Sequence, residues 1–283
     1  MESNVRASLR GLRVVSFESR RAAEIAELIR RYGGEPIAAP SMREIPLTEN
    51  RAALELLPQI EAGHFDILIL MTGVGTRTLN QTLLTRYDQE RILAALKSIR
   101  LVARGPKPVA ALKELGLQAA ATVPEPNTWR EILWVIDVAF DVAGKRIAIQ
   151  EYGIPNPDLV AALERRGATV TAIPIYRWAL PEDITPLRQA IHKIINGAAD
   201  VVLFTNGAQV DHMLSVAAQD GLDGRLRSAF AKLVISSVGP VCTQVLQQFG
   251  LTPDVQPPHP KMGSLIAEVA ASASRVLAAK RAL

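Results

Sequence analysis

Four short segments of this 283-residue chain combine glycine with hydroxyl, amide or cationic side chains, in the pattern of a turn between a strand and a helix. They are 72–75 (Thr-Gly-Val-Gly), 104–107 (Arg-Gly-Pro-Lys), 205–208 (Thr-Asn-Gly-Ala) and 239–243 (Gly-Pro-Val-Cys-Thr). Such turns present backbone N–H groups at a helix N-terminus, where the helix dipole favours anions. One interpretation is therefore capture of a carboxylate or phosphate by these amides, by the hydroxyls and by Arg104 or Lys107. The other is that glycine and threonine only shape and cap each turn; the recurrence of the turns favours binding.

Tyr176 is a second candidate for chemistry. It follows a predicted strand, in the polar segment 174–181. A tyrosine hydroxyl can donate a proton or a hydrogen bond to a leaving oxygen. The alternative is a tyrosine with an apolar body and a solvated tip that has no catalytic role. Spacing alone favours this alternative.

Sequence signatures of several other chemistries are missing. The four histidines, at positions 64, 192, 212 and 259, show no metal-ligand spacing, and none accompanies a nucleophile. Cys242 is the only cysteine, which excludes an internal disulfide and a thiolate zinc site. The segment 73–78 begins like a dinucleotide-binding fingerprint, but threonine stands in place of the third glycine. No nucleophile elbow or P-loop occurs, so hydrolase and kinase interpretations lack a motif.

Composition favours a compact protein with a small anionic ligand. Hydrophobic residues make up 48% of the chain, charged residues 21% and aromatic residues 5%, and the net charge is +4. The basic residues are spread out, unlike the basic and aromatic patches of nucleic-acid-binding proteins, so no nucleic-acid partner is expected. The longest aliphatic run, 67–71, is far shorter than a membrane span. We expect no membrane association, and an N-terminal segment without an apolar stretch predicts a cytoplasmic location.

Short runs rich in Val and Ile alternate with amphipathic segments of helical period, which predicts an α/β fold with parallel sheets. The first unit is predicted as a strand at 12–17, a helix at 20–32 and a strand at 36–39, with Gly33 ending the helix. A capping box at Thr128 and Glu131 predicts a helix start. The last helix is expected at 264–280, after a proline-rich loop.

The order of these segments repeats along the chain. The pattern that starts at residue 11 returns at residue 144, an offset of 133. The blocks that begin near residues 66 and 101 return at an offset of 134. This indicates an internal duplication and two lobes, with ligands beyond the carboxyl ends of the strands, in a cleft between the lobes. The segments 40–47 and 174–181 are predicted linkers.

The chain resembles the uroporphyrinogen-III synthase family over nearly its whole length. The resemblance depends on the order and spacing of many short matches, and no single one is diagnostic. The matching segments are 11–14, 19–20, 34 with 40, 66–72, 105–107, 111–117, 167–177, 204–206, 239–240, 243, 246 and 250–251.

The resemblance implies two Rossmann-like or flavodoxin-like lobes joined by a two-stranded linker, with residues 1–40 plus 178–283 in lobe one and 45–174 in lobe two. It implies a cofactor-independent, metal-free hydro-lyase that cyclises the anionic tetrapyrrole hydroxymethylbilane with inversion of ring D. Hydroxymethylbilane synthase would be the upstream donor. Tyr176 is then the candidate proton donor. The implied substrate-binding residues are Arg20, Thr72, Gly73, Val74, Arg104, Lys107, Thr205, Asn206, Gly207, Gly239, Pro240 and Thr243.

Two departures from the family pattern keep other functions open. The segment 151–155 lacks an arginine often found there, and Pro108 replaces a usual threonine, although Thr243 keeps that threonine in the other repeat. A non-enzymatic, two-lobed sensor of an anionic metabolite is therefore the main alternative. A nucleotide-dependent enzyme is a third hypothesis, which predicts a co-purifying nicotinamide or flavin.

Overall fold

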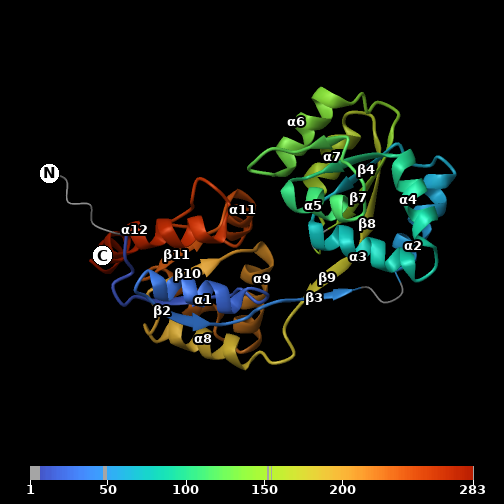
Figure 1. Ribbon diagram of the computed structural model, residues 1–283. Coiled ribbons are helices and arrows are strands. Elements are labelled where there is room, and N and C mark those ends of the chain that lie inside the picture. The colour runs from blue at the N-terminus through green and yellow to red at the C-terminus, as the bar shows by residue number, and fades with distance from the viewer. Residues whose placement is uncertain (1–6, 47–49, 152, 154, 283) are drawn as a thin grey trace. The chain divides into compact units, whose positions relative to one another are not determined.

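The computed structural model in Figure 1 describes residues 7–46, 50–151, 153 and 155–282. The chain divides into two compact units: unit 1 comprises Met1–Arg43 and Ala179–Leu283, and unit 2 comprises Glu44–Trp178. The strands β3 (Arg43–Pro46) and β9 (Tyr176–Ala179) form a two-stranded sheet where the chain passes between the units. Leu47 of the predicted linker lies outside the described residues, as do Tyr152 and Ile154 of the segment 151–155.

Unit 1 is built on a four-stranded parallel sheet of order β11-β10-β1-β2. Its strands are β1 (Arg13–Ser16), β2 (Glu35–Ala38), β10 (Val201–Phe204) and β11 (Val234–Ser237). Its helices are α1 (Ala22–Arg31), α8 (Thr185–Ile195), α9 (Gly207–Gln219), α10 (Asp223–Phe230), α11 (Pro240–Gln248) and α12 (Met262–Arg281). Alternate residues of each strand face opposite layers. Val201 and Leu203 pack with α1 and α12, whereas Val202 and Phe204 pack with α8 to α11.

Unit 2 has a five-stranded parallel sheet of order β6-β5-β4-β7-β8. The strands are β4 (Ile67–Leu70), β5 (Arg100–Ala103), β6 (Ala121–Thr122), β7 (Arg146–Glu151) and β8 (Thr169–Pro174). The helices are α2 (Arg51–Glu61), α3 (Gly73–Leu84), α4 (Gln89–Ser98), α5 (Pro106–Glu114), α6 (Trp129–Ala139) and α7 (Pro157–Glu164). Leu68 and Leu70 face the helices α2 to α5, and Ile67 and Ile69 face α6 and α7. Both faces of the sheet are therefore covered, as a parallel sheet requires.

The two units share one strand order when the chain is read as two halves. In unit 2, β7 and β8 take the places of β1 and β2, and β4 and β5 take those of β10 and β11. Equivalent strands make equivalent hydrogen bonds: the backbone N–H of Arg13 donates to Asp200 at 2.9 Å, and that of Arg146 donates to Asp66 at 2.8 Å. The predicted class, a duplicated α/β fold with two parallel sheets and a two-stranded linker, is confirmed.

Local signals account for most helix ends. The helix predicted at 20–32 is α1, and Gly33 after it has φ +75°, a conformation that glycine adopts without a Cβ clash. The Thr128–Glu131 capping box is present at the start of α6. The last helix is longer than predicted, because it begins at Met262.

Helix α12 is the one helix in the described part of the chain that is long and apolar enough to cross a membrane. Length and composition are weak evidence, since core helices pass the same test. Here Leu265, Val269 and Leu277 are buried with residues of the unit 1 sheet. The helix therefore has an apolar face that packs on the sheet, which explains its composition.

Candidate functional site

The predicted site residues follow the carboxyl ends of the parallel strands. In unit 2, the chain leaves neighbouring strands β4 and β7 toward opposite edges of the sheet, and in unit 1 it does so from β10 and β1. Open parallel sheets bind ligands beyond such a switch point. Unit 2 places there Thr72, Gly73 and Val74 after β4, Arg104 and Lys107 after β5, and Tyr176 at the start of β9. Unit 1 places there Arg20 after β1, Thr205, Asn206 and Gly207 after β10, and Gly239, Pro240 and Thr243 after β11.

Thr72 and Tyr176 bring two hydroxyl groups together in unit 2. Thr72 is the N-cap of α3, and its Oγ1 accepts the N–H of Gly75 at 2.9 Å. The same Oγ1 lies 3.2 Å from the hydroxyl oxygen of Tyr176, and either group can be the donor. Only 4% of Tyr176 is exposed, and the residue belongs to the core cluster of unit 2. Both of the roles considered for Tyr176 are compatible with this placement.

Gln150, at the end of β7, binds the turn that carries Thr72. Its Oε1 accepts the backbone N–H groups of Met71 at 3.2 Å and Thr72 at 3.3 Å. Those amides are therefore already used within the protein. The N–H groups of Gly73 and Val74 have no acceptor among the described residues, so they are the donors of this turn that can meet an anion.

The N-termini of α3 and α5 lie against each other. A Cβ atom added to Gly73 would be 2.6 Å from the carbonyl oxygen of Lys107, which only glycine avoids. Arg104 begins the neighbouring turn, between β5 and α5, and its backbone N–H donates to the carbonyl of Leu70 at 3.0 Å. Two positive helix ends and two cationic residues thus gather at one edge of the sheet, an arrangement suited to an anion. Pro108, the departure from the family pattern, is buried in the first turn of α5.

In the equivalent turn of unit 1, more of the polar groups have hydrogen-bond partners within the protein. The Oε1 of Gln209 accepts the N–H groups of Thr205 at 2.8 Å and Asn206 at 3.3 Å. The Thr205 hydroxyl donates to Glu18 at 2.6 Å and accepts from Gln209 at 2.9 Å. Within the described residues, Gly207 is the turn residue whose N–H has no acceptor. The Thr205 hydroxyl is therefore bound by Glu18 and Gln209, whereas the Thr72 hydroxyl is bound by Gly75 and Tyr176.

The second turn of unit 1 is covered by the proline-rich segment 253–260. Thr243 Oγ1 lies 2.9 Å from Ser237 Oγ and donates to Gln256 at 2.5 Å. A Cβ atom on Gly239 would be 2.7 Å from Pro260. The structure thus places Thr243 in a side-chain network with Gln256.

Burial shifts the pKa values of two groups near these edges of the sheets. Burial raises the pKa of the Glu151 carboxyl, which follows Gln150 at the end of β7. Burial also raises the pKa of the Cys242 thiol to about 11, so this thiol is protonated at neutral pH. Around the described histidines, no group of three or more His, Cys, Asp or Glu side chains is placed to hold a metal ion.

Three residues of this region were not predicted from the sequence: Gln150, Gln209 and Trp178. Trp178 contacts Tyr176 edge to face, with ring centroids 5.2 Å apart. Its indole N–H is buried without an acceptor among the described residues. A glutamine on a strand face that otherwise points into the core was the available signal for Gln150. For Gln209 the signal was the capping-box spacing Asn206–Gln209, which the structure shows at the start of α9. No comparable signal marks Trp178.

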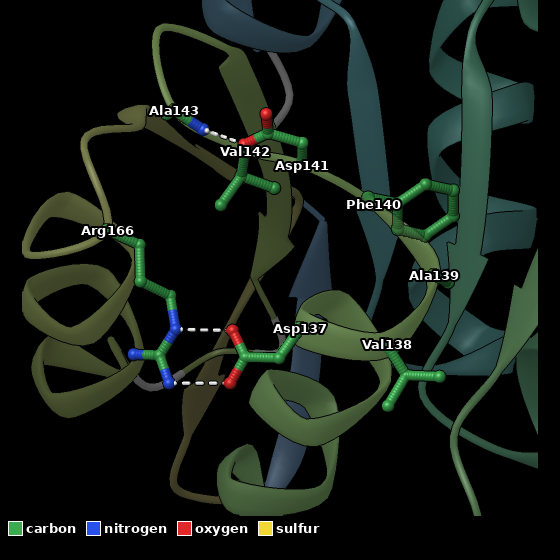
Figure 2. A pocket seen from close by; sticks show the side chains of 8 residues that line it. All are labelled: Asp137, Val138, Ala139, Phe140, Asp141, Val142, Ala143 and Arg166. Atoms are coloured by element: carbon green, nitrogen blue, oxygen red, sulfur yellow. Dashed lines mark hydrogen bonds and ion pairs between the residues drawn. The ribbon is translucent and has the colours of Figure 1, made fainter.

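A pocket of about 520 Å³ lies elsewhere in unit 2 (Figure 2). It is lined by residues 137–143 and Arg166, which pairs with Asp137 at 2.6 and 2.8 Å. Because this segment precedes β7, the pocket lies at the amino ends of the strands. The predicted site residues are at the other end, and none of them is among the described residues that line the pocket.

Comparison with known proteins identifies the family. The family model described as Uroporphyrinogen-III synthase HemD matches residues 23–267. The chain belongs to the uroporphyrinogen-III synthase family. A relative from Bacillus subtilis (strain 168), the uncharacterized protein YjjA, is 30% identical over 93% of this chain and 96% of its own length.

Solved structures of the uroporphyrinogen-III synthase family agree with the fold. A mutant uroporphyrinogen III synthase from the extremely thermophilic bacterium Thermus thermophilus matches with a TM-score of 0.66 and 25% identity, over 90% of this chain and 96% of that one. Uroporphyrinogen-III synthetase from Helicobacter pylori 26695 matches with a TM-score of 0.52 and 15% identity, over the same shares of the two chains. The second likeness concerns the fold alone.

Proposed function

We propose that this chain is a uroporphyrinogen-III synthase that closes linear hydroxymethylbilane with loss of water and inversion of ring D. The observation that carries the proposal is the 3.2 Å contact between the hydroxyls of Thr72 and Tyr176, beside the N-termini of α3 and α5, in a chain of this family. The contact supplies a polarised proton donor, and the helix ends supply binding groups for carboxylates. Positioning of a flexible substrate by such groups supplies much of the rate.

The proposed chemistry needs only modest acid assistance. Thr72 Oγ1 already accepts from Gly75, so its own hydrogen can be donated to the Tyr176 oxygen. Tyr176 then directs its hydrogen to the hydroxyl of the substrate's terminal hydroxymethyl group. The C–O bond breaks, water leaves, and the electron-rich pyrrole becomes an azafulvene. The substituted α-carbon of ring D attacks the methylene carbon of the azafulvene and gives a spiro intermediate. The original bond from that ring D carbon to the methylene of ring C then breaks, and the free α-carbon of ring D bonds to this methylene, so that ring D is inverted as the macrocycle closes. The proton lost from that α-carbon restores the tyrosine.

The other predicted residues are proposed as substrate-binding groups. The substrate carries acetate and propionate carboxylates on every ring. Gly73 and Val74 N–H groups, Arg104 and Lys107 would bind carboxylates at unit 2, each helix end contributing about 0.3–1 kcal/mol. At unit 1 we propose Arg20, the turn 205–207 and the turn at Gly239, Pro240 and Thr243, with Thr205 and Thr243 acting mainly through the backbone that they hold.

Three finer features belong to the same proposal. The reaction is that of a hydro-lyase without cofactor, because the departing group is water and the pyrrole itself supplies the electrons. The substrate would come from hydroxymethylbilane synthase. The cytoplasmic location predicted from the sequence is part of the proposal as well.

A coupled assay tests the function. Porphobilinogen and its deaminase are supplied with and without this chain, the products are oxidised, and the porphyrin isomers are separated. Mostly type III isomer in the presence of the chain is the expected result. Only type I isomer, with the chain folded by circular dichroism, would overturn the proposal. Tetrapyrrole binding without turnover would then support the sensor function.

A further inference from the structure

We infer that Gln150 is a positioning residue, whose buried amide fixes the β4–α3 turn and so sets the Thr72 hydroxyl against Tyr176. The inference rests on the proposed function and names a residue that the family resemblance did not supply. Gln150 is fully buried, with 0% of its surface exposed. It reaches neither hydroxyl itself but holds the backbone of Thr72.

Hydrogen bonds hold both the oxygen and the nitrogen of the Gln150 side-chain amide. Its oxygen accepts from Met71 and Thr72, and its nitrogen donates to the carbonyl of Glu151. Buried amides need such partners because unsatisfied polar groups are costly. Gln150 thereby links the end of β7 to the turn after β4, 78 or 79 positions earlier in the chain.

Packing confirms how tightly the amide is enclosed. A Cβ atom on Gly75 would overlap the side-chain amide of Gln150, so glycine in the first turn of α3 makes room for it. The neighbouring residue of β7 on this face, Ala148, lies in the apolar core cluster of unit 2. A polar residue in this place is unfavourable for the core unless its hydrogen bonds serve the turn.

Unit 1 has no glutamine at the position that corresponds to Gln150. At the offset of 133, Gln150 corresponds to Phe17, which stacks on Phe204 instead. The two turn amides of unit 1 are held by Gln209 from α9, and Gln209 also engages the Thr205 hydroxyl. At the offset of 134, Thr72, the N-cap of α3, corresponds to Asn206, the N-cap of α9, and Met71 corresponds to Thr205. Gln150 holds the equivalent amides from a different strand, and unit 2 has the Thr72 hydroxyl against Tyr176 where unit 1 has the side-chain amide of Asn206.

Kinetics of three variants test this role in the full chain. Gln150→Met keeps the volume but loses the strong acceptor, and we expect kcat to fall about 10- to 100-fold with KM changed less than about threefold. Gln150→Glu at high pH keeps an acceptor for Met71 and Thr72 but cannot donate to the Glu151 carbonyl, which its ionised carboxylate repels, so its kcat should lie between those of the wild type and the Met variant. At low pH its protonated form can accept and donate as glutamine does, so relative activity should recover. Gln209→Met is the matched control and should raise KM rather than lower kcat.

Combination with Tyr176→Phe separates positioning from general stability. If Gln150 acts through the Thr72–Tyr176 pair, Gln150→Met costs little further kcat in the Tyr176→Phe background. Wild-type kcat in the Met variant, additive losses in the double variant, or no recovery of the Glu variant at low pH would each overturn the inference. Should the Met variant not fold, the pH series of the Glu variant decides.

Hydrogen exchange keeps this test apart from that of the function. If wild-type chain yields only type I isomer, the proposed function has failed. The amides of Met71 and Thr72 should still exchange at least about tenfold faster in Gln150→Met, while amides of β1 stay unchanged. Equal exchange at Met71 and Thr72 would overturn the positioning role itself.

Discussion

The carboxylate of Asp200 accepts three hydrogen bonds from Arg13, from the backbone nitrogen, Nε and Nη2, each at 2.9 Å. Burial acts to raise the pKa of Asp200, but these hydrogen bonds and one from Arg281 hold it well below its ordinary value. The pair joins the amino ends of β1 and β10, 187 positions apart in the chain. It therefore fastens the two chain segments from which unit 1 is assembled.

Asp200→Asn should lower the free energy of unfolding at pH 7 by about 2–3 kcal/mol, because charge-assisted hydrogen bonds are lost. The folded-state pKa is depressed, so this contribution is present above the unfolded pKa of about 3.9 and disappears as pH falls through the folded pKa. Urea unfolding of both proteins between about pH 7 and 2 should show their stabilities converging. Asp66→Asn is the control; its side-chain ion pairs are 3.8 Å long and more exposed, so its effect should be about 1 kcal/mol or less. Parallel pH curves would contradict the assignment.

Tyr176→Phe should lower kcat for type III isomer about 100-fold, near the low end for loss of a general acid, with little change in KM. Thr72→Val should lower kcat similarly and also cost about 1 kcal/mol of stability, because it removes the N-cap of α3. Thr72→Ser keeps both hydrogen bonds and is the matched control. Steady-state kinetics and thermal unfolding separate the two effects, and a Phe variant with wild-type kcat would assign Tyr176 a structural role only.

Gly153→Ala should disturb Tyr176 indirectly, by displacing Trp178. Gly153 has φ +88°, and an added Cβ would lie 2.6 Å from the indole of Trp178, which packs on Tyr176. We expect a loss of about 2–3 kcal/mol in stability and a lower kcat, since strain and displacement combine. Gly144→Ala shares the positive φ but meets nothing within 4 Å, so it should show the strain of about 1–2 kcal/mol alone. Equal kcat values for the two variants would argue against the packing link.

Gly73→Ala should weaken substrate binding. The new Cβ would push against the Lys107 carbonyl and separate the N-termini of α3 and α5, so KM should rise about tenfold if both bind carboxylates. Gly224→Ala, in the open first turn of α10, should leave KM unchanged and stabilise slightly, by about 0.4–1 kcal/mol. Unchanged KM in the Gly73 variant would remove this edge from the binding site.

The α/β class and the duplication follow from local patterns that survive in the structure. Aliphatic runs such as 67–70 and 201–204 became central strands because both faces of a parallel sheet are buried. The capping box at the start of α6 could be predicted because its partners, Thr128 and Glu131, are only three residues apart.

The state of each turn residue could not be predicted in this way. Thr72 and Thr205 stand in similar local sequences, yet only Thr205 is engaged by a carboxylate, that of Glu18 just after β1. Gln150 binds residues about 80 positions away in the chain. Trp178 lies against Gly153, which follows β7. Such contacts depend on which strands become neighbours, and no spacing along the chain encodes them.

The division of the chain also has a consequence for synthesis. Unit 2 is one continuous segment, whereas the sheet of unit 1 needs β10, which begins at Val201, beside β1. On the ribosome, β1 can pair with β2 at once but must wait for roughly 160 further residues, about 8 to 30 s at ~5–20 residues per second, before β10 emerges. During that interval the edge of β1 at Val14 and Val15 that will pair with β10 is uncovered.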